Sequence, residues 1–187
     1  MKAKLTNRII LGIDPGTNIM GYGIVEICEK TPLLLEMGII DMRKEKNAYK
    51  SLRTIFSSTI ALIDKFKPDE LAIEAPFYGK NIQSMLKLGR AQGVAISAAL
   101  SRDIPIFEYA PRKIKMSITG RGNASKEQVA AILQHLIHFR EIPKNLDATD
   151  GVAAAVCHFF QSASVIQTKT GKSWKDFIKT HPERIKS

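Results

Sequence analysis

An apolar strand that runs directly into an acidic residue and a tight turn constrains this chain more than any other feature. Residues Arg8 to Thr17 read Arg-Ile-Ile-Leu-Gly-Ile-Asp-Pro-Gly-Thr. The β-branched apolar run is typical of a strand buried on both faces. Pro15 and Gly16 end it, because proline lacks a ladder donor and glycine tolerates a turn. Asp14 is therefore expected at the end of a strand, where ligands collect in α/β sheets; the alternative is that it only caps its own turn.

Net charge is the most informative property of the composition. The 187 residues include 28 Lys or Arg and 18 Asp or Glu, which gives a net charge of +10. Such a chain is expected to bind a polyanion, either nucleic acid or an anionic membrane surface. No apolar run reaches membrane-spanning length and no secretory signal precedes Arg8, so a cytoplasmic protein is expected. Cys28 and Cys157 form no metal-ligand spacing and are expected as reduced thiols.

Turn residues and hydrophobic periodicity divide the chain into alternating elements. Strand-like runs at 21–29 and 32–41 follow the first strand and predict an antiparallel meander. Two further strands are predicted at 70–74 and 104–109, and helices at 48–67, 84–100, 112–118, 126–138 and 147–160. The strand at 70–74 follows a helix and is therefore expected to lie parallel to its partner. The predicted fold class is α/β, with a five-stranded mixed sheet flanked by helices.

One domain is expected to cover residues 1–161, a length that can bury a substantial core. From Ser162 onward the sequence is polar and mostly basic, with Trp174 and Phe177 as its few apolar anchors. Residues 162–187 are therefore expected to form a loosely ordered basic tail.

Four acidic residues stand at the predicted ends of elements. Asp14 ends the first strand, Glu74 ends the fourth, and Asp147 and Asp150 open the last helix on one face. If the first and fourth strands are neighbours, these carboxylates converge and need cations to neutralise them. Oxygen ligands without histidine or thiolate favour Mg²⁺ or Mn²⁺. Two such ions about 4 Å apart would support phosphodiester hydrolysis.

Each acid also has a simpler structural interpretation. Glu74 can be an edge-strand charge in solvent. Asp147 and Asp150 suit an N-cap and a first-turn acid, which are favourable against the helix dipole without any metal. A cap and a metal ligand are compatible roles.

Several motifs in a fixed order carry a resemblance to a known family. They are Leu-Gly-Ile-Asp-Pro-Gly-Thr at 11–17, Gly-Tyr-Gly at 21–23, Ala-Ile-Glu at 72–74 with Phe77, Gly-Lys-Asn at 79–81, Leu-Lys-Leu-Gly-Arg-Ala-Gln-Gly-Val-Ala at 86–95, Phe-Glu-Tyr-Ala at 107–110, and Asp-Ala-Thr-Asp at 147–150. Through them, the chain from about Arg8 to His158 resembles Holliday-junction resolvases of the RuvC type, a branch of the ribonuclease-H-like superfamily.

The resemblance implies a fold, an activity, a cofactor and partners. It implies a ribonuclease-H-like sheet and a homodimer that cuts two strands of a four-way DNA junction symmetrically, in homologous recombination and DNA repair. A two-fold enzyme suits a two-fold substrate, and the helix containing 86–95 would form the dimer contact. Two Mg²⁺ ions per site, replaceable by Mn²⁺, would be held by Asp14, Glu74, Asp147 and Asp150, with Asp14 between them. A complex with a branch-migration helicase is expected, and no membrane partner.

The resemblance also assigns roles to basic and aromatic residues near the acids. Lys115 and Lys126 match positions where the family keeps lysines near the scissile phosphate, where either would stabilise developing negative charge. The alternative is an ordinary phosphate contact or a solvated lysine. Phe77 looks like the family's base-stacking aromatic, although its residue type alone favours a core position. The other expected DNA contacts are Tyr78, Lys80, Arg112, Lys113 and Arg121.

Three other functions fit part of the pattern. Residues 14–17 also resemble the phosphate loop of actin-like phosphotransferases, but that class needs a second phosphate loop and a nucleoside lobe. A non-catalytic DNA-binding protein would share the basic surface, although four carboxylates without metal would weaken its DNA binding. A generic ribonuclease-H-like nuclease would act on an RNA–DNA hybrid.

Overall fold

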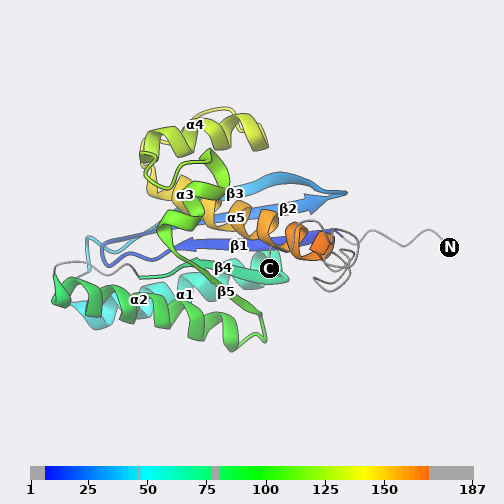
Figure 1. The fold of residues 1–187 in the computed structure, drawn as a ribbon. Coiled ribbons are helices and arrows are strands. Elements are labelled where there is room, and N and C mark those ends of the chain that lie inside the picture. Colours follow the sequence, from blue (N-terminus) through cyan, green and yellow to red (C-terminus); the bar gives the residue numbers. More distant parts are fainter. Residues whose placement is uncertain (1–6, 46, 77–80, 169–187) are drawn as a thin grey trace, which may run out of the picture.

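A computed structural model describes residues 7–45, 47–76 and 81–168, which fold into the α/β arrangement predicted from the sequence (Figure 1). The strands are β1 (Arg8–Asp14), β2 (Ile19–Cys28), β3 (Thr31–Asp41), β4 (Glu70–Glu74) and β5 (Ile106–Tyr109). The helices are α1 (Ala48–Phe66), α2 (Ile82–Leu100), α3 (Pro111–Thr119), α4 (Lys126–Ile137) and α5 (Asp147–Thr168). The predicted element order is confirmed.

The sheet has β1 at its centre, in the order β3-β2-β1-β4-β5. Strand β1 pairs antiparallel with β2, which pairs antiparallel with β3, so the predicted meander is confirmed. Strands β4 and β5 run parallel to β1, as expected for a strand that follows a crossover helix. The carboxyl ends of β1, β4 and β5 therefore meet at one edge of the sheet.

Two hydrophobic cores lie on opposite faces of the sheet. Because successive strand residues point to opposite faces, Ile10 packs with α3, α4 and α5, whereas Leu11 and Ile13 pack with α1 and α2. Figure 1 shows the resulting three layers, with α1 and α2 on one side of the sheet and α3, α4 and α5 on the other. Within the described chain, no helix is both long and apolar enough to cross a membrane.

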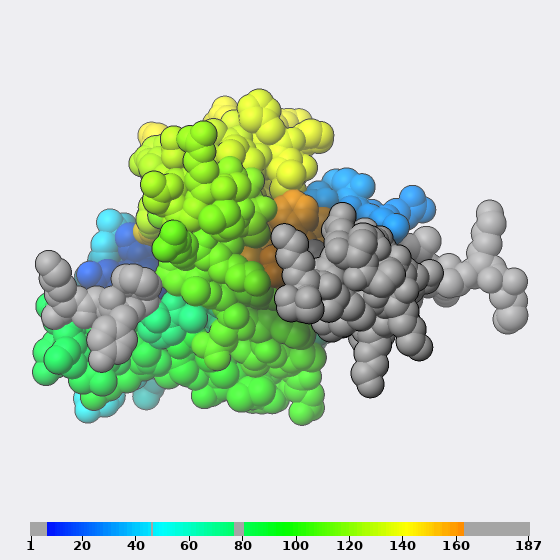
Figure 2. Space-filling model, in the orientation of Figure 1, coloured from blue at the N-terminus to red at the C-terminus, as the bar shows by residue number. Residues whose placement is uncertain are grey.

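Helix α5 is the most enclosed helix in the fold. Every residue from Gly151 to Phe159 is buried, and Figure 2 shows part of this helix in orange beside α3 and α4. The helix continues to Thr168, eight residues beyond its predicted end. Residues 161–168 are mostly polar but contain neither proline nor glycine, the residues that commonly end a helix. Their polarity alone therefore did not end α5.

Glycines let α5 lie directly on the backbone of β1 and β2. A Cβ atom at Gly21 would lie 1.7 Å from the carbonyl oxygen of Asp147, and one at Gly12 would lie 2.1 Å from that of Gly151. Real Cβ atoms do not approach backbone this closely, so any side chain at these positions would push the helix outward. The start of α5 is thereby fixed against the end of β1.

A buried polar network holds the other half of α5. The ring nitrogens of His158 lie 2.6 Å from the Tyr109 hydroxyl and 2.9 Å from a Glu70 carboxylate oxygen, and Phe107 stacks on the imidazole. Arg8 donates to the Ser162 hydroxyl at 2.8 Å. These contacts join the later half of α5 to β1, β4 and β5.

The contact between Gly21 and α5 makes a specific prediction. The variant Gly21→Ala should lower the free energy of unfolding by about 1–3 kcal/mol, because the added methyl group overpacks the contact with Asp147. Thermal unfolding measures the change. An equally stable Gly21→Ala protein would contradict the close packing.

Candidate active site

Strand register places Asp14 and Glu74 side by side at the carboxyl edge of the sheet. The parallel pairing of β1 with β4 ends at Ile13 and Ile73, so the next residue of each strand is the acid. Ala72, two residues before Glu74, belongs to the core that contains α5. Since strand side chains alternate with a period of two, both acids project from the face that α5 covers. The predicted neighbourhood of the two strand ends is confirmed.

The first turn of α5 supplies two further carboxylates. The Asn145 side chain accepts the Asp147 N–H at 3.0 Å. The first turn of α5 is therefore capped without the carboxylate of Asp147 or Asp150. Instead, Lys126 Nζ lies 2.7 Å from Asp147 Oδ1 and 2.5 Å from Asp150 Oδ2. The two aspartates thus face the sheet edge and Lys126.

Three of the four predicted acids form one compact group. Carboxylate oxygens of Asp14, Asp147 and Asp150 all lie within 4.8 Å of one another. Glu74 is not a member of that group, but its charge acts strongly on Asp14. Within the described residues, no hydrogen bond or ion pair reaches the carboxylate of Asp14 or Glu74.

Burial and neighbouring carboxylates raise the pKa values of three acids. Burial, followed by repulsion from Glu74 and Asp150, raises the pKa of Asp14 well above its ordinary value. Burial and then Asp150 raise the pKa of Glu74 to about 7. Burial also raises the pKa of Asp150, although Lys126 opposes the change. The cluster therefore favours binding either protons or a cation.

Both predicted lysines lie near the acids. Burial alone would lower the pKa of Lys126, but its hydrogen bonds to Asp147 and Asp150 raise it overall, so the ammonium stays charged. Lys126 opens α4 directly after Ser125, whose side chain forms a capping box with Gln128. Lys115, half-buried on α3, favours the charged forms of Glu74 and Asp150.

The predicted DNA contacts fall into two groups. Arg112 and Lys113 are exposed on α3, and Arg121 is exposed in the loop that follows it. Lys115 and Lys126 are the cations whose charges act on the acids, whereas Arg112 and Lys113 line a hollow beside Gln161 in the later half of α5. Phe77, Tyr78 and Lys80 lie outside the described residues.

Gln92 supports the site and was not singled out by the sequence. It is 7% exposed, and its Nε2 donates to the Glu74 carbonyl oxygen at 3.3 Å and to a Glu108 carboxylate oxygen at 2.8 Å. The bonds join α2 to the ends of β4 and β5. The sequence offered one sign of this role, which is that Gln92 is a polar residue among small ones such as Ala91 and Ala95 on the buried face of α2.

The donor set fits a hard divalent cation. Asp14, Asp147 and Asp150 offer only carboxylate oxygens, with no histidine or thiolate in the group. Such oxygens suit Mg²⁺, Ca²⁺ or Mn²⁺ rather than softer metals. Burial, and then the neighbouring carboxylates, raise the pKa of Asp14, and a bound cation would oppose both effects.

Comparison with known proteins agrees with this geometry. Residues 10–158 match the family described as crossover junction endodeoxyribonuclease RuvC. The chain belongs to the RuvC family. A RuvC from Bacteroides fragilis is 61% identical over 181 residues, which are 96% of each chain, and one from Christiangramia forsetii is 56% identical over 97% of this chain and 94% of the relative.

A solved RuvC structure confirms the fold. The Thermus thermophilus RuvC in complex with a Holliday junction substrate superimposes with a TM-score of 0.77 at 26% identity, covering 83% of this chain and 94% of that one. The predicted ribonuclease-H-like architecture is thus confirmed, and the RuvC family match spans all four acids.

The raised pKa of Asp14 predicts a dependence of stability on pH. Since the folded protein binds this proton more tightly than the unfolded chain, ionisation costs stability as pH rises from the ordinary carboxyl value toward the folded pKa. Asp14→Asn should therefore raise the Tm of metal-free protein at pH 8 by on the order of a few degrees, and by less at pH 5. Mg²⁺ should raise the Tm of the unsubstituted protein but not that of the variant.

Differential scanning calorimetry in chelator and in Mg²⁺ measures these differences. Asp103→Asn, which removes an exposed carboxylate in the turn after α2, is the matched control and should leave the pH dependence unchanged. A lower Tm for Asp14→Asn at pH 8 would show that the Asp14 charge stabilises the metal-free fold.

Proposed function

We propose that this chain is a crossover junction endodeoxyribonuclease that binds a four-way DNA junction and hydrolyses one phosphodiester in each of two strands of like polarity. The observation that carries the proposal is the group of Asp14, Asp147 and Asp150 at the end of β1. Membership of the RuvC family, and likeness to a RuvC crystallised with a Holliday junction, support it.

Mg²⁺ is the proposed cofactor, at two ions per site, with Mn²⁺ as a substitute. Asp14, Asp147 and Asp150 would hold the first ion, and Glu74 with Asp14 the second. Bound there, Mg²⁺ supplies Lewis-acid stabilisation of the phosphate and lowers the pKa of the attacking water. Glu74, whose pKa is raised to about 7, is largely ionised only above neutral pH, so the second position should fill more readily as pH rises.

The chain's own residues orient the substrate and supply positive charge. The Lys126 ammonium remains protonated, and once a divalent cation neutralises Asp147 and Asp150 its donors become available to a phosphate oxygen. Lys115 brings a second positive charge from α3. A fixed cation near the scissile phosphate stabilises the charge that develops in the transition state. Gln92 keeps the end of β4, and so Glu74, in place.

Contacts to the DNA backbone are proposed for the basic surface on α3 and its following loop. Arg112, Lys113 and Arg121 would fix the position of DNA phosphates. Phe77 is proposed to stack on an unpaired base at the crossover, with Tyr78 and Lys80 beside it.

A homodimer is proposed to pack through α2. Ile82, Leu86 and Leu100 are 69%, 55% and 57% exposed on one side of this helix. Gly89 and Gly93, on the same side, have open space at their Cβ positions. Two copies joined there would present two equivalent sites to a two-fold substrate. The proposal includes action in the cytoplasm together with a branch-migration helicase.

Cleavage of a synthetic four-way junction, beside linear duplex of the same sequence, tests the proposed activity. With Mg²⁺ the protein should make paired nicks in the junction alone, and chelator should abolish them. Asp14→Asn should slow cleavage by a factor on the order of 10³ or more. It should bind the junction as tightly or more tightly, because a negative charge near the phosphates is lost.

Each other result has a defined meaning. Undiminished cutting by Asp14→Asn would refute the role of the acid group. Tight junction binding without cleavage in Mg²⁺ would indicate a DNA-binding protein on this fold. Preferential cutting of an RNA–DNA hybrid would indicate a general ribonuclease-H-like nuclease.

A further inference from the structure

A groove lies on the opposite face of the sheet from the acids, between the first halves of α1 and α2. Its volume is about 640 Å³. Thr17 and Asn18, from the turn that follows Asp14, form one wall. Asn47 (the N-cap of α1), Ser51 of α1 and Ser84 of α2 add hydrogen-bonding groups. Met42, Leu52 and Ile55 are among the apolar residues of the lining.

The cations of this groove are available for a ligand. Lys87 and Arg90 line it from α2 and are exposed, and neither forms an ion pair or hydrogen bond with the described residues. Arg43 also lines it but is paired with Asp41 at 2.7 Å. Against these cations stands one acid in the lining, Glu45, which accepts a hydrogen bond from the neutral Thr54 hydroxyl. With Arg43 paired, Lys87 and Arg90 outnumber Glu45, and the net charge of the groove is positive.

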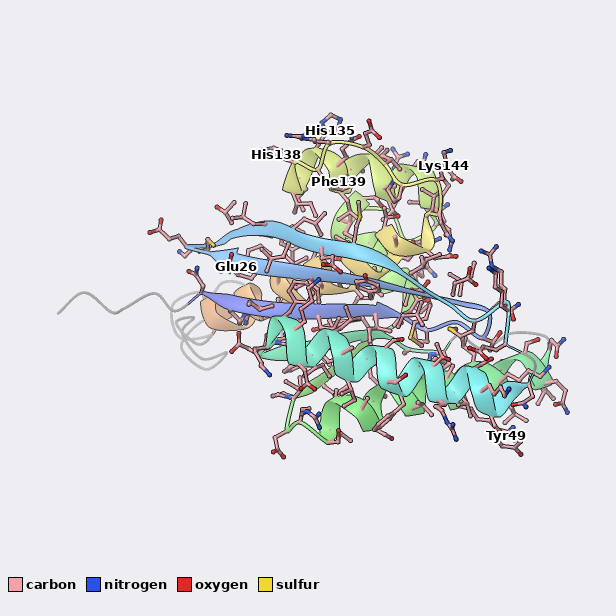
Figure 3. All side chains as sticks on the ribbon, turned by 180° about the vertical axis from the view of Figure 1, so that it is seen from behind. Glu26, Tyr49, His135, His138, Phe139 and Lys144 are labelled. Carbon is pink, nitrogen blue, oxygen red and sulfur yellow. The ribbon has the colours of Figure 1, made fainter. Side chains whose placement is uncertain are left out.

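Two helix dipoles and an aromatic side chain add to this character. Both α1 and α2 begin at the groove, and neither has an acidic residue in its first turn. Their positive N-terminal ends are therefore not neutralised from within the helix. Tyr49, at the start of α1, is 81% exposed and points away from the body of the protein in Figure 3. Basic and aromatic groups together are typical of nucleic-acid surfaces.

The groove begins close to the proposed site of cleavage. Thr17 follows Asp14 by three residues, so their Cα atoms lie within about 11 Å. That distance is at most a few nucleotides of B-form DNA, since each nucleotide rises about 3.4 Å along the helix axis and successive phosphates lie farther apart than this rise. A strand whose scissile phosphate meets the acids can therefore cross the turn and reach the groove.

We propose that this groove binds the phosphate backbone of a junction arm next to the cut, with Lys87 and Arg90 as its phosphate contacts and Tyr49 at its rim. The inference rests on the proposed function, because it assigns the groove to the same DNA substrate. It adds a contact surface on the α1 and α2 face to the basic surface on α3.

Binding of a four-way junction at a series of salt concentrations tests the proposal, with every variant in an Asp14→Asn background to prevent cleavage. The double variant Lys87→Gln/Arg90→Gln should bind about 10- to 100-fold more weakly at low salt. Its plot of log affinity against log salt should be shallower by about 1 to 2. The control Lys30→Gln/Lys67→Gln loses the same charge from exposed residues at the opposite edge of the sheet and should keep the original slope.

Neutral methylphosphonate linkages, placed within about three nucleotides of the cut, locate the contact. They should weaken binding by the parent protein but cause little further loss in the Lys87→Gln/Arg90→Gln variant, because both changes remove the same interaction. If the losses of affinity from the methylphosphonates and from the Lys87→Gln/Arg90→Gln variant were fully additive, the groove would not be the contact. The same conclusion would follow if the salt dependence of that variant had the slope of the control.

The two levels of proposal fail in different ways. If the unsubstituted protein cuts junctions but the groove variant binds like its control, the groove inference is wrong and the proposed function stands. If the unsubstituted protein never cuts junctions, the proposed function is wrong, and the salt slopes still decide whether the groove binds DNA.

Discussion

The direct contact of α5 with the backbone of β1 and β2 determines the rest of the active site. Because Gly12 and Gly21 carry no side chain, the first turn of α5 lies against the end of β1, and the carboxylates of Asp147 and Asp150 come within 4.8 Å of that of Asp14. The buried network around His158 holds the same helix at its other half. A rigid, enclosed helix can keep like charges together, whereas a mobile one would let them separate.

The clustered acids destabilise the metal-free fold, because their charges are buried and repel one another. The same buried negative charge makes the cluster a binding site for a cation. Burial and mutual repulsion raise the pKa of Asp14 and Glu74, and Lys126, which is bonded to Asp147 and Asp150, offsets this only in part. Functional sites often depart from what stability alone would favour, and the surrounding structure compensates. In this fold the compensation comes from the two hydrophobic cores and from the hydrogen bonds of Gln92, which brace the end of β4.

Much of the fold and the site followed from the sequence because it depended on local patterns. Asp14 and Glu74 were recognisable as strand ends, and strand alternation then fixes the face on which they project. The Lys126 contacts and the Gln92 bonds were less accessible, since they depend on how α2, α4 and α5 pack in three dimensions. The glycines at 12 and 21 read locally as strand or turn residues, and their role appears only once α5 lies over them. The extra length of α5 was missed because polarity was taken as a helix end.

Anomalous diffraction from crystals grown with Mn²⁺ would show whether α5, packed against β1, builds a cation site. We expect Mn²⁺ bound by Asp14, Asp147 and Asp150, with Lys126 Nζ displaced from its present bonds to the two α5 aspartates. A structure in which Lys126 keeps both bonds at saturating Mn²⁺, with no anomalous peak among the three carboxylates, would contradict this expectation.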